Sequence, residues 1–292
     1  MSELNSPCSY QGGKQRLAKD IVKELLRYAD ENTIFYDLCC GSGAVFLELI
    51  NQGVSPNRIH AVDKGGFGYF WQSISDGTFD INYFKERIDS LPEVKDLQGY
   101  LKRLSGEPVN KETLAYDYLL LQAGAFGSKW IGISDDKWTN TTFRNYWLPT
   151  ATSNRKSPVN PMMPMPDTLY KRVASIVEEC GNKLNAMHGN VEDFIEEING
   201  QTNCIVYIDP PYKDTTGFNG FDIEGFVSKI NHTLFVSEGY IMPDITKQIE
   251  YGKRNKGNIS GTKKKDAVQE ILNIFERLET IKGDEGDEGE NE

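Results

Sequence analysis

Between residues 33 and 63 the chain alternates two strand-like apolar stretches with one stretch of helical spacing. "TIFYDLCC" (33–40) has the character of a buried strand and runs into the glycine turn "GSG". "AVFLELINQG" (44–53) then has a helical pattern, and "RIHAVD" (58–63) is strand-like again. Strand, glycine turn, helix and strand in this order open a parallel α/β sheet. We therefore predict an α/β fold.

The same pattern returns late in the chain. "CIVYID" (204–209) and "TLFVSE" (233–238) are strand-like and enclose the helix-like "DIEGFVSKIN" (222–231). Before the first strand, "KQRLAKDIVKELLRYA" (14–29) places apolar residues on one helical face. Residues 76–185 differ, because they are rich in turns, aromatic residues and prolines and hold few strand-like runs. We interpret 76–185 as an inserted second domain, mostly helical or irregular, between the two parts of a discontinuous domain, 1–75 and 186–283.

The net charge of −11 argues against a nucleic-acid partner, but the charge is unevenly spread. The tail 284–292, "DEGDEGENE", holds six acids and no base, which is typical of a disordered segment. "GKRNKGNISGTKKK" (252–265) holds six bases and no acid. A basic face of this kind binds phosphates whatever the net charge. Two ordinary solvated charge runs are the alternative.

The cysteines and the hydropathy indicate a reduced, water-soluble protein. The five cysteines form no CxxC pattern, and the three histidines are scattered, so neither a disulfide framework nor a metal site is expected. No apolar run approaches eighteen residues, and the N-terminus lacks the layout of a signal peptide. We expect a cytoplasmic protein without membrane contact, a monomer with a weak dimer as the alternative.

Three stretches predict a ligand site. In "DLCCGSGAVF" (37–46) the glycine turn lets a ligand approach the backbone near a helix N-terminus, but Phe46 stands where a dinucleotide fingerprint needs a third glycine. Asp63, at the end of the next strand, is placed to accept hydrogen bonds from ribose hydroxyls. In "SYQGGK" (9–14) two glycines allow close approach, and Lys14 could meet the carboxylate of an amino-acid moiety.

"CIVYIDPPY" (204–212) predicts the chemistry. Two prolines after Asp209 fix the backbone and donate no hydrogen bond, so Pro210 and Pro211 form a rigid bend whose carbonyls stay available. The carboxylate of Asp209 and a proline-region carbonyl can each accept one hydrogen of an exocyclic amine, while Tyr212 stacks on the ring. Holding the amine in this way aims its lone pair at an electrophile. A bend that only terminates a strand is the alternative.

With SYQGGK, FYDLCCGSGAVF and DPPY in this order, the chain resembles the Dam-like DNA N6-adenine methyltransferases, in particular the phage and prophage members. The resemblance covers most of residues 7–280. It implies a Rossmann-like S-adenosyl-L-methionine (SAM)-dependent methyltransferase fold with an inserted target-recognition domain, SAM as cofactor, and double-stranded DNA as partner. The cell would be a bacterium or a phage-infected host, with restriction–modification as a setting. Leu38, Cys39 and Gln11 depart from the usual pattern.

The resemblance also assigns roles by position. The cofactor-binding residues would be Tyr10, Gly13, Lys14 (near the methionine end), Asp37, Gly41, Gly43, Asp63, Asn190, Val191 and Asp209. Asp193 is the alternative for the adenine contact, and a helix N-cap is the alternative for Asn190. The catalytic residues would be Asp209, Pro210, Pro211 and Tyr212 acting on a flipped adenine. Phe218 could close over the base, whereas Cys39 and Cys40 are interpreted as packing residues.

The DNA-binding residues are predicted from charge and aromatic content. They are Lys137, Trp138, Arg144, Tyr146, Trp147 and Arg155 in the insertion, and Lys253 and Arg254. Methylation of RNA adenine, or of cytosine N4, stays open within the enzymes, although cytosine enzymes generally carry serine at the position of Asp209. A methyltransferase acting on protein glutamine would carry asparagine there. A non-catalytic DNA-binding or decoy protein is the alternative from another class.

Overall fold

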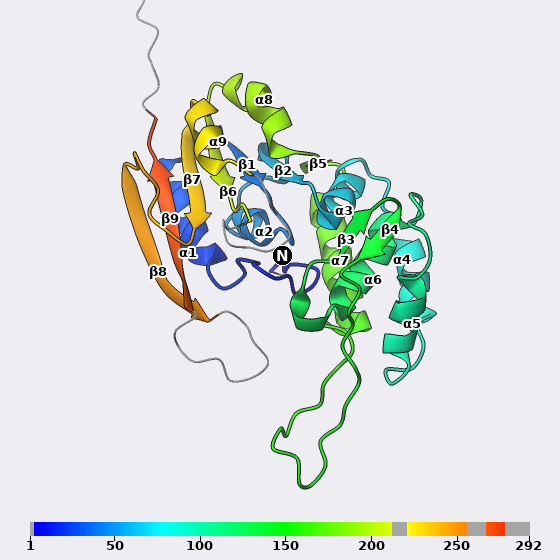
Figure 1. Cartoon of the computed structure of the whole chain (residues 1–292). Helices are drawn as coiled ribbons and strands as arrows, with labels where there is room; N and C mark the ends of the chain where they lie inside the picture. The colour runs from blue at the N-terminus through cyan, green and yellow to red at the C-terminus, as the bar shows by residue number, and fades with distance from the viewer. Residues whose placement is uncertain (1–2, 212–220, 256–266, 278–292) are drawn as a thin grey trace, which may run out of the picture.

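A seven-stranded sheet forms the centre of the computed structural model, which describes residues 3–211, 221–255 and 267–277 (Figure 1). The strand order is β5-β2-β1-β6-β7-β9-β8. The strands are β1 (Ile34–Leu38), β2 (Ile59–Asp63), β5 (Asn185–His188), β6 (Cys204–Ile208), β7 (Thr233–Glu238), β8 (Lys247–Asn255) and β9 (Ala267–Phe275). A separate two-stranded ribbon consists of β3 (Gly132–Ser134) and β4 (Lys137–Thr139). The predicted α/β class is confirmed, with a mostly parallel sheet.

The direction in which successive strands are added to the sheet reverses between β1 and β6. Strands β5, β2, β1, β6 and β7 pair in parallel, whereas β9 is antiparallel to both β7 and β8. From β1 the chain first adds β2 and β5 on one side and then β6 and β7 on the other. The crevice at such a switch point, outside the carboxyl ends of the strands, is where open α/β sheets bind ligands. The pairs Leu38↔Ile208 and Leu38↔Val62 align the carboxyl ends of β1, β6 and β2 there.

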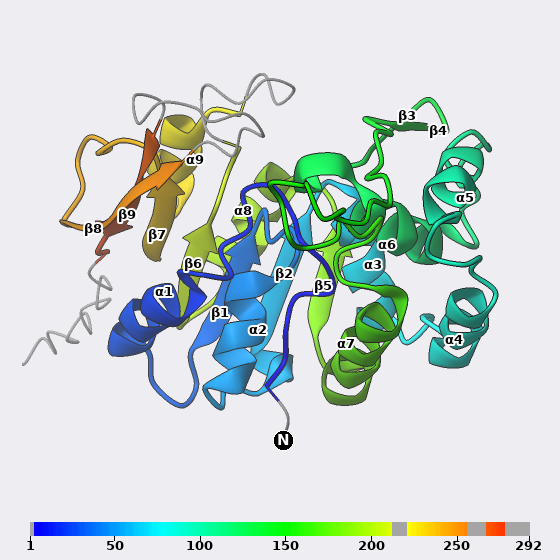
Figure 2. The ribbon, with the colours of Figure 1, turned by 90° about the horizontal axis from the view of Figure 1, so that it is seen from below.

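Helices cover both faces of the sheet, as Figure 1 and Figure 2 show. Helices α1, α2 and α3 pack on one face with a large core, and α8 and α9 pack on the other with a smaller one. The helices are α1 (Ala18–Leu25), α2 (Ala44–Asn51), α3 (Gly66–Ser75), α4 (Ile81–Asp89), α5 (Leu97–Leu104), α6 (Leu114–Gly124), α7 (Pro166–Cys180), α8 (Ile195–Asn199) and α9 (Ile223–Lys229). None of the helices in the described ranges combines the length and apolarity that a membrane crossing requires.

Side chains of the buried strands alternate between the two faces, as the pleat requires. In β1, Phe35 packs in the α1–α3 core, whereas Tyr36 and Leu38 pack in the α8–α9 core. Asp37 follows the parity of Phe35, which places its carboxyl on the α1–α3 side. Burial on both faces explains why these strands are near-continuous apolar runs in the sequence.

Residues 76–185 form helices α4–α7 and the β3–β4 ribbon beside the β5 edge of the sheet (Figure 2). Helix α6 is buried along its whole length and packs against α3. Leu119 of α6 and Val173 of α7 belong to the same core as the sheet residues under α1–α3. The segment is largely helical, as the sequence indicates, and its status as a separate domain stays a prediction.

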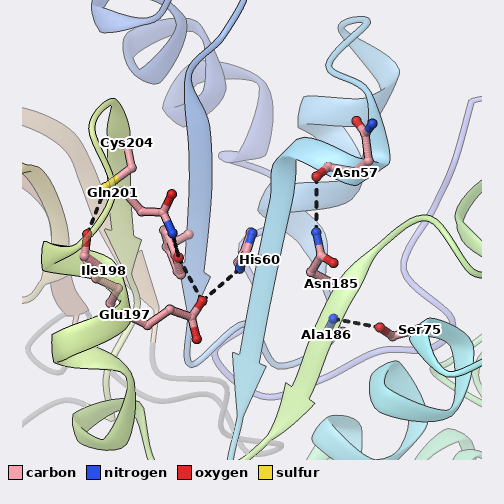
Figure 3. A network of polar contacts seen from close by, with 10 residues as sticks. Asn57, His60, Ser75, Asn185, Ala186, Glu197, Ile198, Gln201 and Cys204 are labelled. Carbon is pink, nitrogen blue, oxygen red and sulfur yellow. Dashed lines mark hydrogen bonds and ion pairs between the residues drawn. The ribbon is translucent and has the colours of Figure 1, made fainter.

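On the α8–α9 face a polar group, here called the Tyr36 cluster, consists of Tyr36, His60, Glu197 and Gln201. The Tyr36 hydroxyl donates to Glu197 Oε1 (2.9 Å) and accepts from Gln201 Nε2 (3.1 Å). His60 Nδ1 lies 3.2 Å from the same carboxylate oxygen. Figure 3 shows Glu197 extending from α8 to His60 on β2. These contacts fasten a short helix to the sheet.

Candidate active site

Three carboxyl groups meet at the carboxyl ends of β1, β2 and β6. Asp37 lies in β1, Asp63 is the last residue of β2, and Asp209 follows β6 directly. The Asp209 N–H donates to Leu38 O (3.2 Å), which continues the parallel ladder by one residue. Because parallel strands end at the same edge, residues far apart in sequence are brought to one place. The sequence predicted all three as site residues, and the structure brings them together.

The glycine turn between β1 and α2 is held by its neighbours on both sides. Asp63 Oδ2 accepts from the Gly41 N–H (2.8 Å), and Trp71 Nε1 donates to Gly41 O (2.8 Å). Gly43 has φ +75°, and a Cβ there would lie 2.6 Å from ring atoms of Phe46 and Trp71. Only glycine fits such a position, because the backbone is left-handed and the space is filled by aromatic rings. The turn is therefore rigid.

Asp37 takes over the capping of α2. The N-cap residue Gly43 has no side chain, and Asp37 Oδ2 accepts from the Phe46 N–H (3.0 Å) at the third helical position. The second oxygen, Oδ1, is buried and has no hydrogen-bond partner among the described residues. Burial raises the pKa of Asp37 well above its usual range, partly opposed by the Phe46 N–H, and the charges of Asp209 and Asp63 raise it further. A hydrogen-bond donor on a ligand would give Asp37 Oδ1 the partner that it lacks.

Asp63 organises the loops on both sides of its strand. Besides Gly41, its carboxylate accepts from the Gly65 N–H through Oδ1 (2.7 Å). Burial raises the pKa of Asp63, and these N–H donors oppose the rise. A carboxylate has about four lone-pair sites, so two backbone contacts leave acceptor capacity for a ligand hydroxyl. The ribose contact stays a prediction.

The N-terminal segment lies across this edge of the sheet, between the glycine turn and the insertion. The Tyr10 ring packs edge-on against Phe67, at a centroid distance of 5.2 Å. Its edge lies over Gly41, where a Cβ would be 3.1 Å from the ring. The Gln11 N–H donates to Ser128 O (2.7 Å), and the Gly13 N–H donates to Tyr10 O (3.1 Å). Tyr10 thus lies beside Gly41, and Gly13 is held next to Tyr10; their contact with a cofactor stays a prediction.

The residues predicted to contact the cofactor adenine follow β5. The Gly189 N–H donates to Asp63 O (3.2 Å), which places this segment beside the end of β2. Asn190 is the N-cap residue of a short 3₁₀ helix, Val191–Phe194, but its side chain donates to Glu192 Oε2 (3.0 Å) and caps no N–H. Val191 is buried and Asp193 is exposed. Asn190 therefore occupies the N-cap position with its backbone, but its side chain does not cap the helix.

Lys14 joins Asp209 to the reversed strand β9. Its Nζ lies 2.6 Å from Asp209 Oδ1 and 3.7 Å from Glu270 Oε2. The side chains of Lys14 and Glu270 are 4% and 5% exposed, and that of Asp209 is 18% exposed. Glu238, at the end of β7, is also buried. We call these four residues the Lys14 cluster.

Sequence reasoning missed the two glutamates of this cluster. Burial raises the pKa of Glu238 to about 7, with Gly239 N–H and Lys14 opposing and Asp209 and Glu270 adding to the rise. The signal was present in the sequence, because Glu238 ends the apolar run "TLFVSE". Glu270 lies inside the apolar "AVQEILNIF" (267–275). An acid within a buried strand needs a partner or a function.

Cys39 and Cys40 lie next to the carboxylates. Burial raises the pKa of both thiols well above the usual range, and the charge of Asp63 adds to this. A thiol is nucleophilic as its thiolate, so these two are chemically inert at neutral pH. This supports the interpretation of both as packing residues.

The structure describes only the first residues of the loop that begins with DPPY. Pro210 is buried and Pro211 is half-buried. Tyr212 and Phe218, predicted to stack on and to cover the target base, lie outside the described residues. In the described part of the chain no group of three or more His, Cys, Asp or Glu side chains could hold a metal ion.

The residues predicted to bind DNA are placed in different surroundings. Trp138 is 7% exposed and packs in the core, and the Arg144 guanidinium donates to Ala123 O (3.4 Å) and Ser128 Oγ (2.9 Å). Lys137 and Arg155 are exposed, and Tyr146 lines a shallow hollow with Glu93, Val94 and Lys95. Lys253 and Arg254 lie in β8, and most of 252–265 falls outside the described residues.

Arg155 belongs to a projecting part of the insertion. Figure 1 shows the chain between β4 and α7 extending away from the rest of the molecule. Trp147 and Val159 close its base by exchanging two backbone hydrogen bonds (3.1 and 2.8 Å). We call residues 147–159 the arm. Residues 137–166, which include the arm, hold four Lys and Arg and no Asp or Glu.

A second hollow lies at the opposite end of the strands. It is lined by Tyr28, Asn203, Cys204, Ile205, Asn231, His232, Thr233 and Arg277, at the amino ends of β6 and β7. The Asp209 edge, at the carboxyl ends, is separated from it by the length of the strands. The hollow is therefore not part of the candidate site.

No protein-family model matches this sequence, and a comparison with curated proteins found no match either. The candidate site therefore depends on the residues and their geometry alone.

Proposed function

We propose that this protein is a site-specific DNA methyltransferase that uses SAM to methylate N6 of an adenine flipped out of duplex DNA. The observation that carries the proposal is the position of Asp209. This carboxylate begins the sequence DPPY, follows β6 directly, and lies at the switch point of the sheet beside the glycine turn. Ligands of open α/β sheets bind at this place.

The residues around the glycine turn suit SAM. Gly41 and Gly43 give the turn the left-handed backbone that its close packing requires, Tyr10 provides an aromatic wall over Gly41, and Asp63 retains acceptor capacity for a ribose. Asp37 Oδ1 is a buried acceptor without a donor. Carboxyl groups on three strands supply hydrogen-bond acceptors rather than the donors and cations that a pyrophosphate needs, and the nearby Lys14 is paired with Asp209. SAM carries a positively charged sulfonium, whereas a dinucleotide carries a pyrophosphate.

The chain itself would position the amine. Bound SAM supplies the methyl group. Asp209 accepts one N6 hydrogen and the carbonyl of Pro210 accepts the other, which orients the nitrogen lone pair. Asp209 is also placed to take the proton that the amine loses. Tyr212 would stack on the extruded base, since a base inside the duplex cannot reach such a pocket.

The arm is our candidate for DNA contact. Its exposed Trp147, Leu148, Arg155 and Lys156 combine apolar and basic groups on a segment without acids. Lys137, in the β3–β4 ribbon, is also exposed. Trp138 and Arg144 would support the arm from inside rather than touch DNA. Phosphate contacts by such bases make affinity fall steeply with salt.

The test is transfer of labelled methyl from SAM to unmethylated genomic DNA, with digestion to nucleosides to identify the product. We expect label in N6-methyladenine, lost by about 10³-fold or more in Asp209→Ala with SAM binding retained. Asp89→Ala, which removes an acid with a 57% exposed side chain on α4, is the matched control. Asp193→Ala separately tests the alternative adenine contact through its SAM affinity. Full activity of Asp209→Ala would exclude this mechanism. SAM binding without label in DNA or RNA would favour a decoy protein.

A further inference from the structure

Among the described residues, Lys14 is a buried cation that lies among the carboxylates at the β6, β7 and β9 end of the candidate site. Lys14 contacts Asp209 (2.6 Å) and Glu270 (3.7 Å), and its Nζ also lies 3.4 Å from Gly12 O. The three charged residues come from the N-terminal segment, the loop after β6 and strand β9. A contact between residues 195 positions apart in sequence is formed only in the folded chain.

Lys14 is placed differently from the sequence-based expectation. The resemblance puts it near the methionine end of SAM, where it would meet a ligand carboxylate. In the structure it meets a carboxylate of the protein, at hydrogen-bond distance and almost out of reach of solvent. Charged hydrogen bonds of this length are strong and hold their partners in one orientation.

We propose that Lys14 is a positioning residue that keeps Asp209 ionised and fixes its carboxylate for the substrate amine, with Glu270 holding Lys14 in place. The proposal rests on the proposed function, since the amine is that of the target adenine. An ionised Asp209 presents only acceptors to the amine, whereas a protonated carboxyl keeps acceptor capacity but adds an O–H donor that competes for the nitrogen lone pair. One contact with Lys14 leaves capacity for the amine, since a carboxylate has about four lone-pair sites.

The other groups around Asp209 oppose its charge. Glu270 on β9, Glu238 on β7 and Asp37 on β1 are acids, and Tyr10, Cys39 and Tyr207 are neutral weak acids at this edge. Among the described groups that interact with Asp209, Lys14 supplies the positive charge. An opposite charge at 2.6 Å favours the ionised form of Asp209. Removing the charge of Lys14 should therefore make protonation of Asp209 easier.

The first test is the pH profile of methyl transfer at saturating SAM and DNA. In Lys14→Met we expect kcat to fall about 100-fold at pH 7, and the acid limb to move up by about one to three pH units. Glu270→Gln keeps an acceptor for Lys14 but removes a negative charge, so its acid limb should move down. Lys14→Arg should restore the wild-type limb. Lys19→Met, which breaks an exposed ion pair with Glu3 (3.0 Å), is the matched control and should leave the profile unchanged.

SAM affinity, measured by calorimetry, distinguishes the two roles of Lys14. A positioning residue leaves the SAM Kd of Lys14→Met within about threefold of wild type, whereas loss of a contact to the SAM carboxylate raises it about tenfold or more. A raised Kd with an unchanged pH profile would overturn the proposal. Unchanged kcat and profile in Lys14→Met would overturn it as well.

Urea unfolding provides a measurement that does not depend on activity. If Lys14 and Asp209 act as a pair, Lys14→Met lowers the midpoint in the wild-type background and has a smaller effect in Asp209→Asn, where the contact of Lys14 with Glu270 remains. Equal effects in both backgrounds would contradict the pairing. If wild type transfers no methyl group to DNA, the proposed function fails, and the unfolding and SAM-binding results still decide whether Lys14 belongs to Asp209. Lys14→Arg serves the same comparison if Lys14→Met does not fold.

Discussion

The Lys14 cluster lies at the carboxyl ends of β6 and β7, whereas the Tyr36 cluster lies on the α8–α9 face of the sheet, and the two are held together differently. Lys14, Glu238 and Glu270 are buried, and the contacts of Lys14 join segments at the two ends of the chain. The Tyr36 cluster is partly exposed, with Glu197 40% and His60 19% exposed. Its hydrogen bonds fasten α8 to β1 and β2. Burial makes each charge of the first cluster consequential, whereas water stabilises the charge of Glu197 in the second.

This comparison separates a functional from a structural use of similar residues. A buried carboxylate needs a nearby cation to stay ionised, so the Lys14 cluster fixes a charge state. A half-exposed carboxylate stays ionised in water and only adds a hydrogen bond. We therefore expect changes of charge in the two clusters to have effects of very different size.

The largest difference is expected when one carboxylate in each cluster loses its charge. Asp209→Asn should lower methyl transfer about 100-fold to 1000-fold, because the amine loses a charged acceptor. Glu197→Gln, the same type of change in the Tyr36 cluster, should leave methyl transfer unchanged. Methyl transfer by both variants is measured with labelled SAM at saturating DNA. Equal losses of methyl transfer in the two variants would mean that the comparison between the two clusters is wrong.

The rigidity of the Asp209 edge can be tested through the two ends of α2. Gly43→Ala should reduce the free energy of unfolding by about 2–4 kcal/mol, because the new Cβ meets two aromatic rings in a left-handed backbone. Gly53 follows the same helix with φ +95° and has nothing within 4 Å of a Cβ. Gly53→Ala should cost only about 1 kcal/mol, the strain of the backbone alone. Urea unfolding measures both. Equal losses in the free energy of unfolding would show that the glycine turn can shift to accommodate the new Cβ.

Glu238 and His60 should give the two clusters opposite dependence on pH. The pKa of Glu238 is raised to about 7 from a usual 4.5, so its contribution to stability is complete below pH 4.5 and is lost as pH rises through 7. Glu238→Gln removes this loss and keeps an acceptor for the Gly239 N–H. The variant should gain stability relative to wild type between pH 5 and pH 8, measured by urea unfolding. A constant difference over that range would contradict the assignment.

The smallest effect is expected at His60. Burial lowers its pKa below the usual 6.5, with Glu197 opposing, so its unfolded form takes up a proton more readily than its folded form. Stability is then lost as pH falls below 6.5. His60→Gln should reduce this loss by about 1 kcal/mol or less between pH 7.5 and pH 5. If the loss is as large in the variant, other groups carry the acid sensitivity.

The sequence predicted the parts of the fold that are local. The strands ending at Asp37, Asp63 and Asp209 were identified by apolar runs, and the glycine turn and α2 follow from short-range pattern. The meeting of these carboxyl groups at one edge follows from parallel order, so three distant acids could be assigned to one site. The observed elements agree with these predictions to within a few residues at their ends.

The sequence did not predict what depends on pairing between distant segments. The ion pair of Lys14 and Asp209 needs the N-terminal segment to lie across the sheet edge, which no local pattern indicates. The place of Glu270 depends on β9 being antiparallel between β7 and β8. The wholly buried α6 also has no polar face by which its period could be judged. The signal available in the sequence for these buried pairs was a charged residue within an apolar run.

The position of β9 has a consequence for synthesis on the ribosome. Strand β8 is translated before β9 but joins the sheet only by pairing with β9. Glu270, which contacts Lys14, also lies in β9. A nascent chain that ends before residue 267 has no place for β8 and lacks one member of the Lys14 cluster. Translation must therefore pass residue 267 before the Lys14 cluster can be complete, and products that terminate earlier should lack the proposed methyl transfer however well their five parallel strands have folded.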